Sequence, residues 1–69
     1  MKKLEFKPSD MEGVIEEAWS PQGTYRLVRT WFGAIRIWRG TEELSLHSCC
    51  FTARMIAQHY YDCYRRRNR

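Results

Sequence analysis

Residues 24–39 read TYRLVRTWFGAIRIWR and alternate apolar with polar side chains on both sides of a central glycine. Tyr25 and Leu27 occupy one side of this alternation before the glycine, and Ile35 and Ile37 occupy it after the glycine. A two-residue period is typical of strands with one buried face, and a glycine between two such runs is typical of a hairpin. The segment therefore predicts two paired antiparallel strands whose apolar face the rest of the chain must cover.

The sequence after this hairpin predicts one more strand and then a helix. Beyond the RGTEE turn, Leu44 and Leu46 continue the alternation, and their spacing predicts that both lie on the face of Ile35 and Ile37. From about Ser48, which can serve as the N-cap, the period changes to that of a helix. The predicted apolar stripe consists of Cys49, Ala53, Ile56, Ala57, Tyr60 and Tyr64. We expect an α+β domain, a three-stranded antiparallel sheet packed on one face by a C-terminal helix.

Residues 9–19 fit either a helix or an additional strand. Ser9 and Glu12 have the spacing of a capping box, and the apolar residues that follow recur at helical spacing. A glycine and two β-branched residues at 13–15 favour a strand instead, and the SPQG turn suits the end of either element. The sequence leaves both alternatives open.

The size and composition indicate a small folded domain. A chain of 69 residues forms one domain, residues 1–69, and its apolar fraction of 43% is too high for a disordered chain. No apolar run approaches the roughly 18 residues of a membrane span, and MKKLEFKPSD lacks the apolar stretch of a signal peptide, so we expect no membrane contact and a cytoplasmic location. The odd number of cysteines, two of them adjacent, favours reduced thiols. Homodimerisation is compatible with this size, because a small chain gains stability from burying a second surface.

The charges are distributed unequally along the chain. Residues 1–23 contain three lysines and five acidic residues, a net charge of −2, whereas residues 24–69 contain nine arginines and three acidic residues, a net charge of +6. Every lysine precedes Pro8 and every arginine follows Gly23. Arginine makes bidentate contacts with phosphate and guanine and stacks on aromatic rings. The basic half therefore suggests an anionic partner.

The sheet face opposite the predicted helix is the expected binding surface. The residues expected there are Arg26, Val28, Thr30, Ala34, Arg36, Trp38, Ser45 and His47, with Glu43 near one corner. Arginines beside an exposed tryptophan suit phosphates, base edges and stacked bases, and a β-ribbon is thin enough to enter the major groove of DNA.

Residues 24–64, which include the run YRLVRTWFGAIRIWRGTEELSLHSCCFTARMIAQHYYD, resemble small DNA-binding modules with three strands and a helix. These modules occur in phage-type integrase arm-binding domains, in plant ethylene-response-factor domains and in CedA-like cell-division activators. The resemblance rests on the order strand, strand, strand, helix, on an FTAxxIA-like start of the helix and on the placement of aromatic residues.

This resemblance implies that the sheet lies in the major groove and that the helix supports it from behind. The residues implied in base and phosphate contacts are Arg26, Arg36 and Trp38, with Arg29 and Arg39 on the flanks. The chain departs from the pattern in its short link between the first two strands and in Glu42 and Glu43, which would repel a nearby phosphate.

The C-terminal YYDCYRRRNR is a second basic element. Arg65, Arg66, Arg67 and Arg69 place four positive charges in the last five residues, either along an extended helix or on a flexible arm. Such residues can follow a phosphate backbone. Cations are also favoured at any helix C-terminus by the helix dipole, so the tail alone does not indicate binding.

The cysteines and histidines of the second half of the chain suggest two chemical sites, and ordinary half-buried residues are the alternative. His47, Cys50, His59 and Cys63 have the spacing H-x2-C-x8-H-x3-C, which invites a zinc interpretation. If the helix starts near Cys50, His59 lies about 13 Å along its axis, too far to share a tetrahedral ion. Cys50 and His47 lack a third orienting group and an oxyanion site for catalysis. We therefore expect no metal, no cofactor and no enzymatic activity.

Together these features predict a small DNA-binding regulatory protein, of the phage or mobile-element type, that uses an arginine- and tryptophan-bearing sheet face and a basic tail. The alternative is an inhibitor or adaptor that docks on a larger host protein, because Trp, Tyr and Arg also dominate protein interfaces. An exposed cluster of Trp19, Trp31, Phe32 and Met55 would favour the protein partner. A sheet face of arginines with only Trp38 among them would favour DNA.

Overall fold

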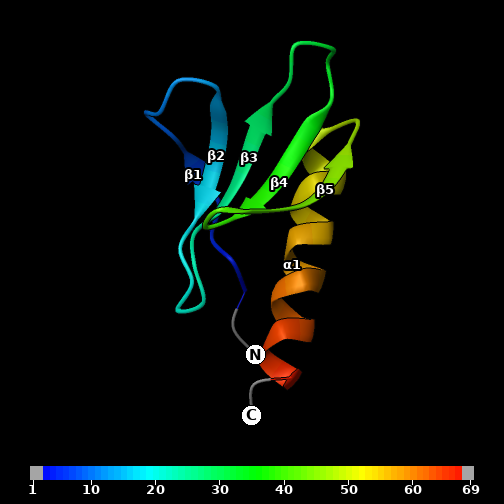
Figure 1. Ribbon diagram of the computed structural model, residues 1–69. Coiled ribbons are helices and arrows are strands. Elements are labelled where there is room, and N and C mark those ends of the chain that lie inside the picture. Colours follow the sequence, from blue (N-terminus) through cyan, green and yellow to red (C-terminus); the bar gives the residue numbers. More distant parts are fainter. Residues whose placement is uncertain (1–2, 68–69) are drawn as a thin grey trace.

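The computed structural model describes the backbone of residues 3–67 and the side chains of residues 3–64. It contains a five-stranded antiparallel sheet with one helix against one face (Figure 1). The strands lie in chain order, so each pairs with its neighbours in the sequence. The elements are β1 Lys7–Pro8, β2 Val14–Ala18, β3 Tyr25–Arg29, β4 Ile35–Arg39, β5 Glu42–His47 and α1 Cys50–Arg67. The α+β class is confirmed, but the predicted three-stranded sheet is wrong because the N-terminal segment adds two strands.

Residues 9–19 form a turn and strand β2, so the strand alternative is confirmed and the helix alternative is wrong. The Ser9 hydroxyl does not cap a helix, because it accepts the Met11 N–H at 3.1 Å and donates to the Glu17 carboxylate at 2.7 Å. The Val14 N–H donates to the Met11 carbonyl at 3.1 Å and closes the turn. These bonds turn the chain so that β2 pairs with β1. A helix at this position could not have paired with β1.

The β3–β4 hairpin has the predicted pairing. Leu27 lies opposite Ile37, and Arg26 lies opposite Trp38. Partners in an antiparallel pair point to the same face of the sheet, so the apolar and the basic residues separate onto opposite faces as expected. Leu27 and Ile37 are fully buried.

The register of β5 differs from the prediction because the strand contains a β-bulge. Trp38 pairs with Glu43, whereas Ile37 pairs with Ser45, so Leu44 is an extra residue. Leu44 still packs against the core, but Leu46 lies opposite Arg36 and is exposed. The prediction that both leucines face the core is therefore wrong for Leu46. A bulge adds one residue and reverses the alternation beyond it.

The same bulge moves two residues of the predicted open face. Ser45 pairs with Ile37, and His47 pairs with Ile35, so both lie on the face that α1 covers. The Ser45 hydroxyl and the His47 Nε2 are 2.8 Å apart. The prediction that Ser45 and His47 belong to the open face is wrong for this reason.

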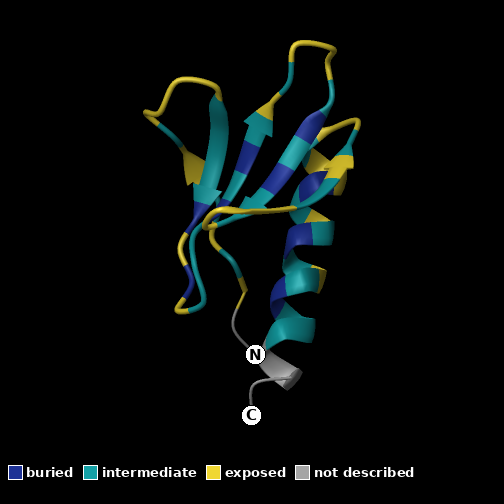
Figure 2. Cartoon of the chain, viewed as in Figure 1, coloured by how far each residue is buried: buried dark blue, intermediate teal, exposed yellow. Residues whose placement is uncertain are grey.

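The core lies between the sheet and α1, where Figure 2 shows the buried residues of both layers. Its buried residues are Tyr25, Leu27, Ile35, Ile37, Ala53, Ala57 and Tyr61. The two alanines let the helix approach the sheet closely, and Tyr61 meets Tyr25 edge to face with ring centroids 6.2 Å apart. Tyr61 was missing from the predicted stripe.

The helix begins one residue later than the predicted cap implies. It starts at Cys50, so Cys49 occupies the cap position: its sulfur accepts the Thr52 N–H at 3.5 Å, and its carbonyl accepts the Ala53 N–H at 3.0 Å. Cys49 is exposed and does not belong to the apolar stripe.

The N-terminal segment lies against the same side of the sheet as α1. Leu4 and Phe6 are half-buried against the core, and the Leu4 N–H donates to the Gln58 side chain of the helix at 2.8 Å. Strand β2 is joined to α1 by a two-bond ion pair in which Arg54 donates to Glu16 at 2.6 and 3.0 Å. The N-terminal segment and the helix thus cover the inner face of the sheet together.

Candidate nucleic-acid interface

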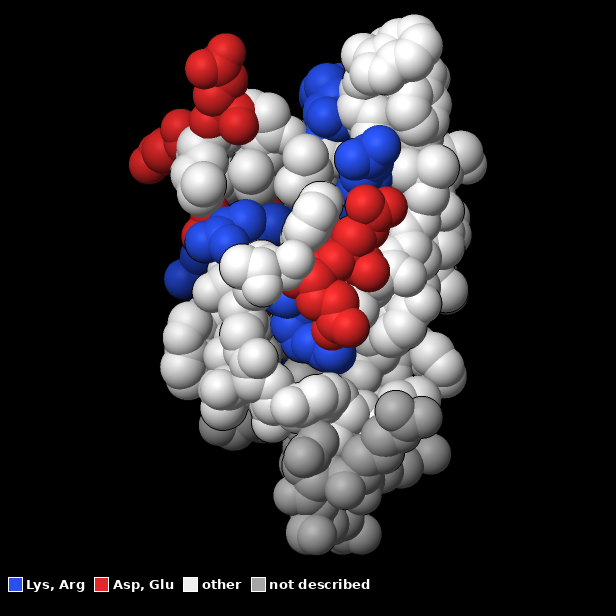
Figure 3. Space-filling model, viewed as in Figure 1, with Lys and Arg blue, Asp and Glu red and all other residues white. Residues whose placement is uncertain are grey.

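The face of the sheet turned away from α1 mixes charges of both signs. By the strand register, its residues are Lys7, Val14, Glu17, Arg26, Val28, Arg36, Trp38, Glu43 and Leu46. In Figure 3, acidic side chains lie between basic ones across the middle of the molecule. A mixed face produces a weaker positive potential than the arginines alone would produce.

Arg26 and Arg36, two of the predicted contact residues, lie on this face as expected. Arg36 is 3.9 Å from Glu43, and Arg26 lies opposite Glu17 on β2 and Trp38 on β4. The Nε atoms of both arginines are buried and have no hydrogen-bond partner. Each arginine therefore has one acidic residue beside it, Glu17 for Arg26 and Glu43 for Arg36, and each has an unused Nε donor.

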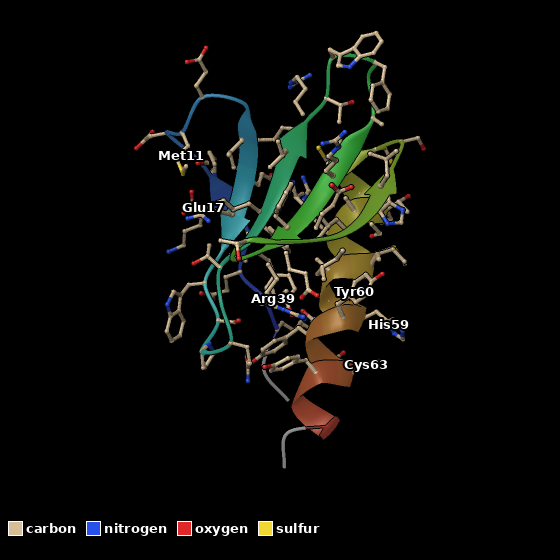
Figure 4. All side chains as sticks on the ribbon, in the orientation of Figure 1. Met11, Glu17, Arg39, His59, Tyr60 and Cys63 are labelled. Carbon is tan, nitrogen blue, oxygen red and sulfur yellow. The ribbon has the colours of Figure 1, made fainter. Side chains whose placement is uncertain are left out.

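Arg39, predicted on the flank of the interface, lies on the inner side of the sheet instead. It donates to the Tyr25 hydroxyl at 3.4 Å and to Glu42 at 2.8 Å, and its guanidinium lies 4.6 Å from the centre of the Tyr64 ring. Only 15% of its side chain is exposed. Burial works against its charge, but the bonds to Tyr25 and Glu42 outweigh burial and raise the pKa of Arg39. Its Nη1 and Nη2 groups each donate one hydrogen bond within the fold, where Arg39 is labelled in Figure 4.

The tip of the β3–β4 hairpin presents two aromatic side chains to solvent. Trp31 is 94% exposed and Phe32 is 48% exposed. Their rings meet edge to face, with centroids 5.3 Å apart. Arg29, at the end of β3, is exposed and has no hydrogen bond or ion pair among the described side chains. The tip therefore combines an aromatic pair with a free cation.

The backbone of this tip is fixed by Thr30 and Gly33. The Thr30 hydroxyl donates to the Ala34 carbonyl at 2.8 Å and accepts the Ala34 N–H at 2.9 Å. Gly33 has φ of +86°, a conformation that residues with a Cβ rarely adopt. The aromatic pair is thus presented by an ordered turn.

The predicted exposed cluster of Trp19, Trp31, Phe32 and Met55 does not form, although all four side chains are exposed. Trp31 and Phe32 contact each other, but Trp19 follows β2 at the opposite end of the sheet, and Met55 lies on α1 (Figure 1). Trp19, at 73% exposure, and Met55 are each exposed separately. The alternation of the sequence predicted a hairpin that contains these aromatic residues. It did not predict that Trp31 and Phe32 lie at the tip, beyond the paired strands.

The predicted basic tail falls largely outside the described part of the structure. Arg65, Arg66 and Arg67 belong to α1, but their side chains, like Arg69, lie outside the described residues. Their role in binding stays a prediction.

The four residues with zinc-like spacing do not converge. His47 contacts Ser45, Cys50 packs against the core, and His59 and Cys63 lie together one helical turn apart. Among residues 3–67, no group of three or more His, Cys, Asp or Glu side chains is placed to hold a metal ion.

An open cleft of about 830 Å³ lies beside β1, away from the hairpin tip. Lys3, Leu4, Asp10, Glu17 and Trp19 are among its lining residues. The labelled Met11 and Glu17 mark this region in Figure 4. Nothing in the sequence pattern predicted it, because its walls come from the N-terminal coil, β1, β2, the loops that follow these strands and Tyr61 of α1, which only the fold brings together.

Comparison with known proteins gave no match: no family model, no curated protein and no solved structure is significantly similar to this chain. In the described part of the chain, no helix is both long and apolar enough to cross a membrane.

Proposed function

We propose that this protein binds DNA through the β3–β4 hairpin. The observation that carries the proposal is the exposed Trp31–Phe32 pair, held at the tip of a hairpin whose strands and loop contain no acidic residue. Exposed aromatic rings stack on bases or wedge between base steps, and neighbouring arginines bind the phosphates. Thr30 and Gly33 preorganise the tip, so little ordering is required when DNA binds.

The arginines divide into two groups in this proposal. The Arg29 side chain has no hydrogen bond or ion pair among the described residues, and it contacts phosphate directly beside the aromatic tip. Arg26, Arg36 and Trp38 form a second contact zone on the open face, where Glu17 and Glu43 reduce the attraction. The hairpin tip therefore supplies more of the affinity than the middle of the sheet.

The experiment is fluorescence anisotropy of labelled single-stranded and duplex DNA of random sequence, measured over a series of salt concentrations. If about five phosphates are neutralised, log K falls with log salt with a slope of about −4 to −5. Absence of binding to either DNA at low salt would overturn the proposal, because non-specific contacts are strongest there.

Two tryptophan variants test whether DNA binding requires the tryptophan at the hairpin tip or any exposed tryptophan. Trp31→Ala weakens binding by about 1 to 3 kcal/mol, the contribution of one base–aromatic stack. Trp19→Ala is the matched control, because Trp19 is also exposed but lies at the opposite end of the sheet. Equal losses in the two variants would contradict binding at the tip.

A charge variant tests the phosphate contact. Arg29→Gln reduces the magnitude of the salt slope by about 1. Lys3→Gln is the control, because it removes an exposed cation that is far from the hairpin tip in the sequence. If the phosphate contact is local to the tip, this variant leaves the slope of log K against log salt unchanged.

The second candidate function is docking on a larger protein, and one observation favours it. Phe51 and Met55 lie one helical turn apart on α1, and both are exposed. An apolar pair on the outer side of a helix is typical of helix-mediated docking. A purified partner whose binding is lost in Phe51→Ser/Met55→Ser but retained in Trp31→Ala would support this function in place of DNA binding.

A further inference from the structure

His59 and Cys63 form a pair of metal-ligating side chains that neither proposed function uses. They lie one turn apart on α1, on the side of the helix away from β1 and β2 (Figure 4). The Cys63 sulfur and the His59 Nε2 are 3.6 Å apart, and the contact is exposed to solvent. Two ligands four residues apart on a helix can share one metal ion.

The separation of these two atoms matches the edge of a zinc coordination tetrahedron. Zinc–sulfur bonds are about 2.3 Å long and zinc–nitrogen bonds about 2.0 to 2.1 Å. At a tetrahedral angle these lengths place sulfur and nitrogen about 3.5 to 3.6 Å apart. The observed 3.6 Å therefore lets both atoms bind one ion without a change of the helix backbone.

One chain supplies only half of the ligands that such an ion needs. Structural zinc is almost always bound by four protein ligands. Within residues 3–67 no third His, Cys, Asp or Glu side chain joins this pair. His47 contacts Ser45, and Cys50 packs against the core, so neither lies beside this pair.

We propose that His59 and Cys63 are a zinc half-site, and that the same pair from a second copy of this chain completes a four-ligand site with two nitrogens and two sulfurs. The pair is accessible on the outer side of α1, where Met55 and Phe51 are exposed one and two turns earlier and offer apolar surface to a second helix. A two-fold axis through the ion makes the two contributions identical.

The protonation changes balance in this arrangement. Each Cys63 thiol loses its proton to solvent and binds as thiolate, and each His59 binds as neutral imidazole through Nε2. Two thiolates neutralise the charge of one Zn²⁺ ion, and two protons are released for each ion bound. Acidic pH therefore opposes binding.

The test is titration of the reduced full-length chain with Co²⁺, followed by absorption, together with sedimentation in the presence and absence of Zn²⁺. We expect a thiolate-to-cobalt charge-transfer band, tetrahedral d–d bands and saturation at one metal per two chains. We also expect the sedimenting mass to double with Zn²⁺ and to return to its original value when a chelator is added.

Matched variants assign the ligands. Cys63→Ser and His59→Gln abolish the charge-transfer band and the doubling, and circular dichroism checks that both variants fold. Cys49→Ser removes another exposed thiol and leaves both signals unchanged. Saturation at one metal per chain without a change in mass, or a signal lost in Cys49→Ser and kept in Cys63→Ser, would overturn the proposal.

Discussion

At the scale of single residues, arginines that look equivalent in the sequence have different roles. Arg29 and Arg39 both flank the predicted interface, but Arg39 is held by Tyr25, Glu42 and Tyr64, whereas Arg29 projects into solvent. A guanidinium whose donors are used within the fold contributes to stability and has little left for a phosphate.

Replacing Arg39 therefore changes stability. Arg39→Ala lowers the free energy of unfolding by about 1 to 3 kcal/mol, because it removes two hydrogen bonds and the packing of the side chain on Tyr25 and Tyr64. Urea unfolding measures this change. Arg29→Ala is the control and stays within about 0.5 kcal/mol, as an exposed substitution should. Equal changes would show that the Arg39 contacts contribute nothing.

Cys49 differs from an ordinary exposed cysteine because it caps α1. The hydrogen bond between the Cys49 thiol and the Thr52 hydroxyl, and the bond that the sulfur accepts from the Thr52 N–H, lower the pKa of Cys49. A lower pKa increases the thiolate fraction at neutral pH, so alkylation at Cys49 begins at lower pH than in an unstructured peptide. The rate of iodoacetamide labelling, followed by mass spectrometry as a function of pH, measures the midpoint. Thr52→Ala moves the midpoint upward, and an unchanged midpoint would contradict the role of this hydroxyl.

At the scale of secondary-structure elements, the β3–β4 hairpin depends on its turn as much as on its strands. The Thr30 hydroxyl makes two hydrogen bonds to Ala34 and fixes the loop that presents Trp31 and Phe32. Strand alternation determines which residues pair, but these side-chain bonds determine how the aromatic rings are held.

Removing that hydroxyl tests the role of the turn. Thr30→Val has nearly the same shape, loses both bonds and lowers the free energy of unfolding by about 1 to 2 kcal/mol. Because the tip becomes less ordered, DNA affinity falls as well. Thr41→Val is the control, since Thr41 is exposed and its side chain makes no hydrogen bond with the described residues. Chemical denaturation and the anisotropy titration measure the two effects, and a loss of stability as small as that of the control would contradict the assigned role.

At the scale of the whole molecule, the core is closed by parts from both ends of the chain. Helix α1 packs on β3, β4 and β5, and the N-terminal segment adds Leu4 and Phe6 beside it. A chain this short buries a smaller fraction of its surface than a larger domain does, so each half-buried apolar side chain contributes a large share of the stability.

Truncation of Phe6 tests this closure. Phe6→Ala lowers the free energy of unfolding by about 1 to 3 kcal/mol, less than a fully buried phenylalanine because Phe6 is only half-buried. Glu5→Ala, the neighbouring exposed position, leaves stability nearly unchanged. Thermal unfolding of the two variants compares them. If they unfold at the same temperature, the N-terminal segment does not help to close the core.

The sequence predicted those parts of the fold and site whose signal is local. The alternation of residues 24–39 was enough for the β3–β4 pairing, and helical spacing was enough for α1, although its first residue was misplaced by the cap at Cys49. The positions of Arg26, Arg36 and Trp38 on one face followed from the same alternation. A strand with one buried face shows a two-residue hydrophobic period in its sequence, because successive side chains point to opposite faces of the sheet.

The remaining features were decided by tertiary contacts. The two-residue strand β1 carries no periodic signal, and β2 is a strand paired with β1 on one side, where Ser9 bonds to Glu17, and with β3 on the other. One inserted residue in β5 reversed the faces of the residues that follow it. The free Arg29 and the enclosed Arg39 are indistinguishable by composition, because the partners of Arg39 come from three separate positions in the chain. The sequence alone determined the strands of the hairpin and the helix. Only the tertiary structure decided which arginines and aromatic residues remain free to bind, because burial and pairing depend on neighbours that are distant in the sequence.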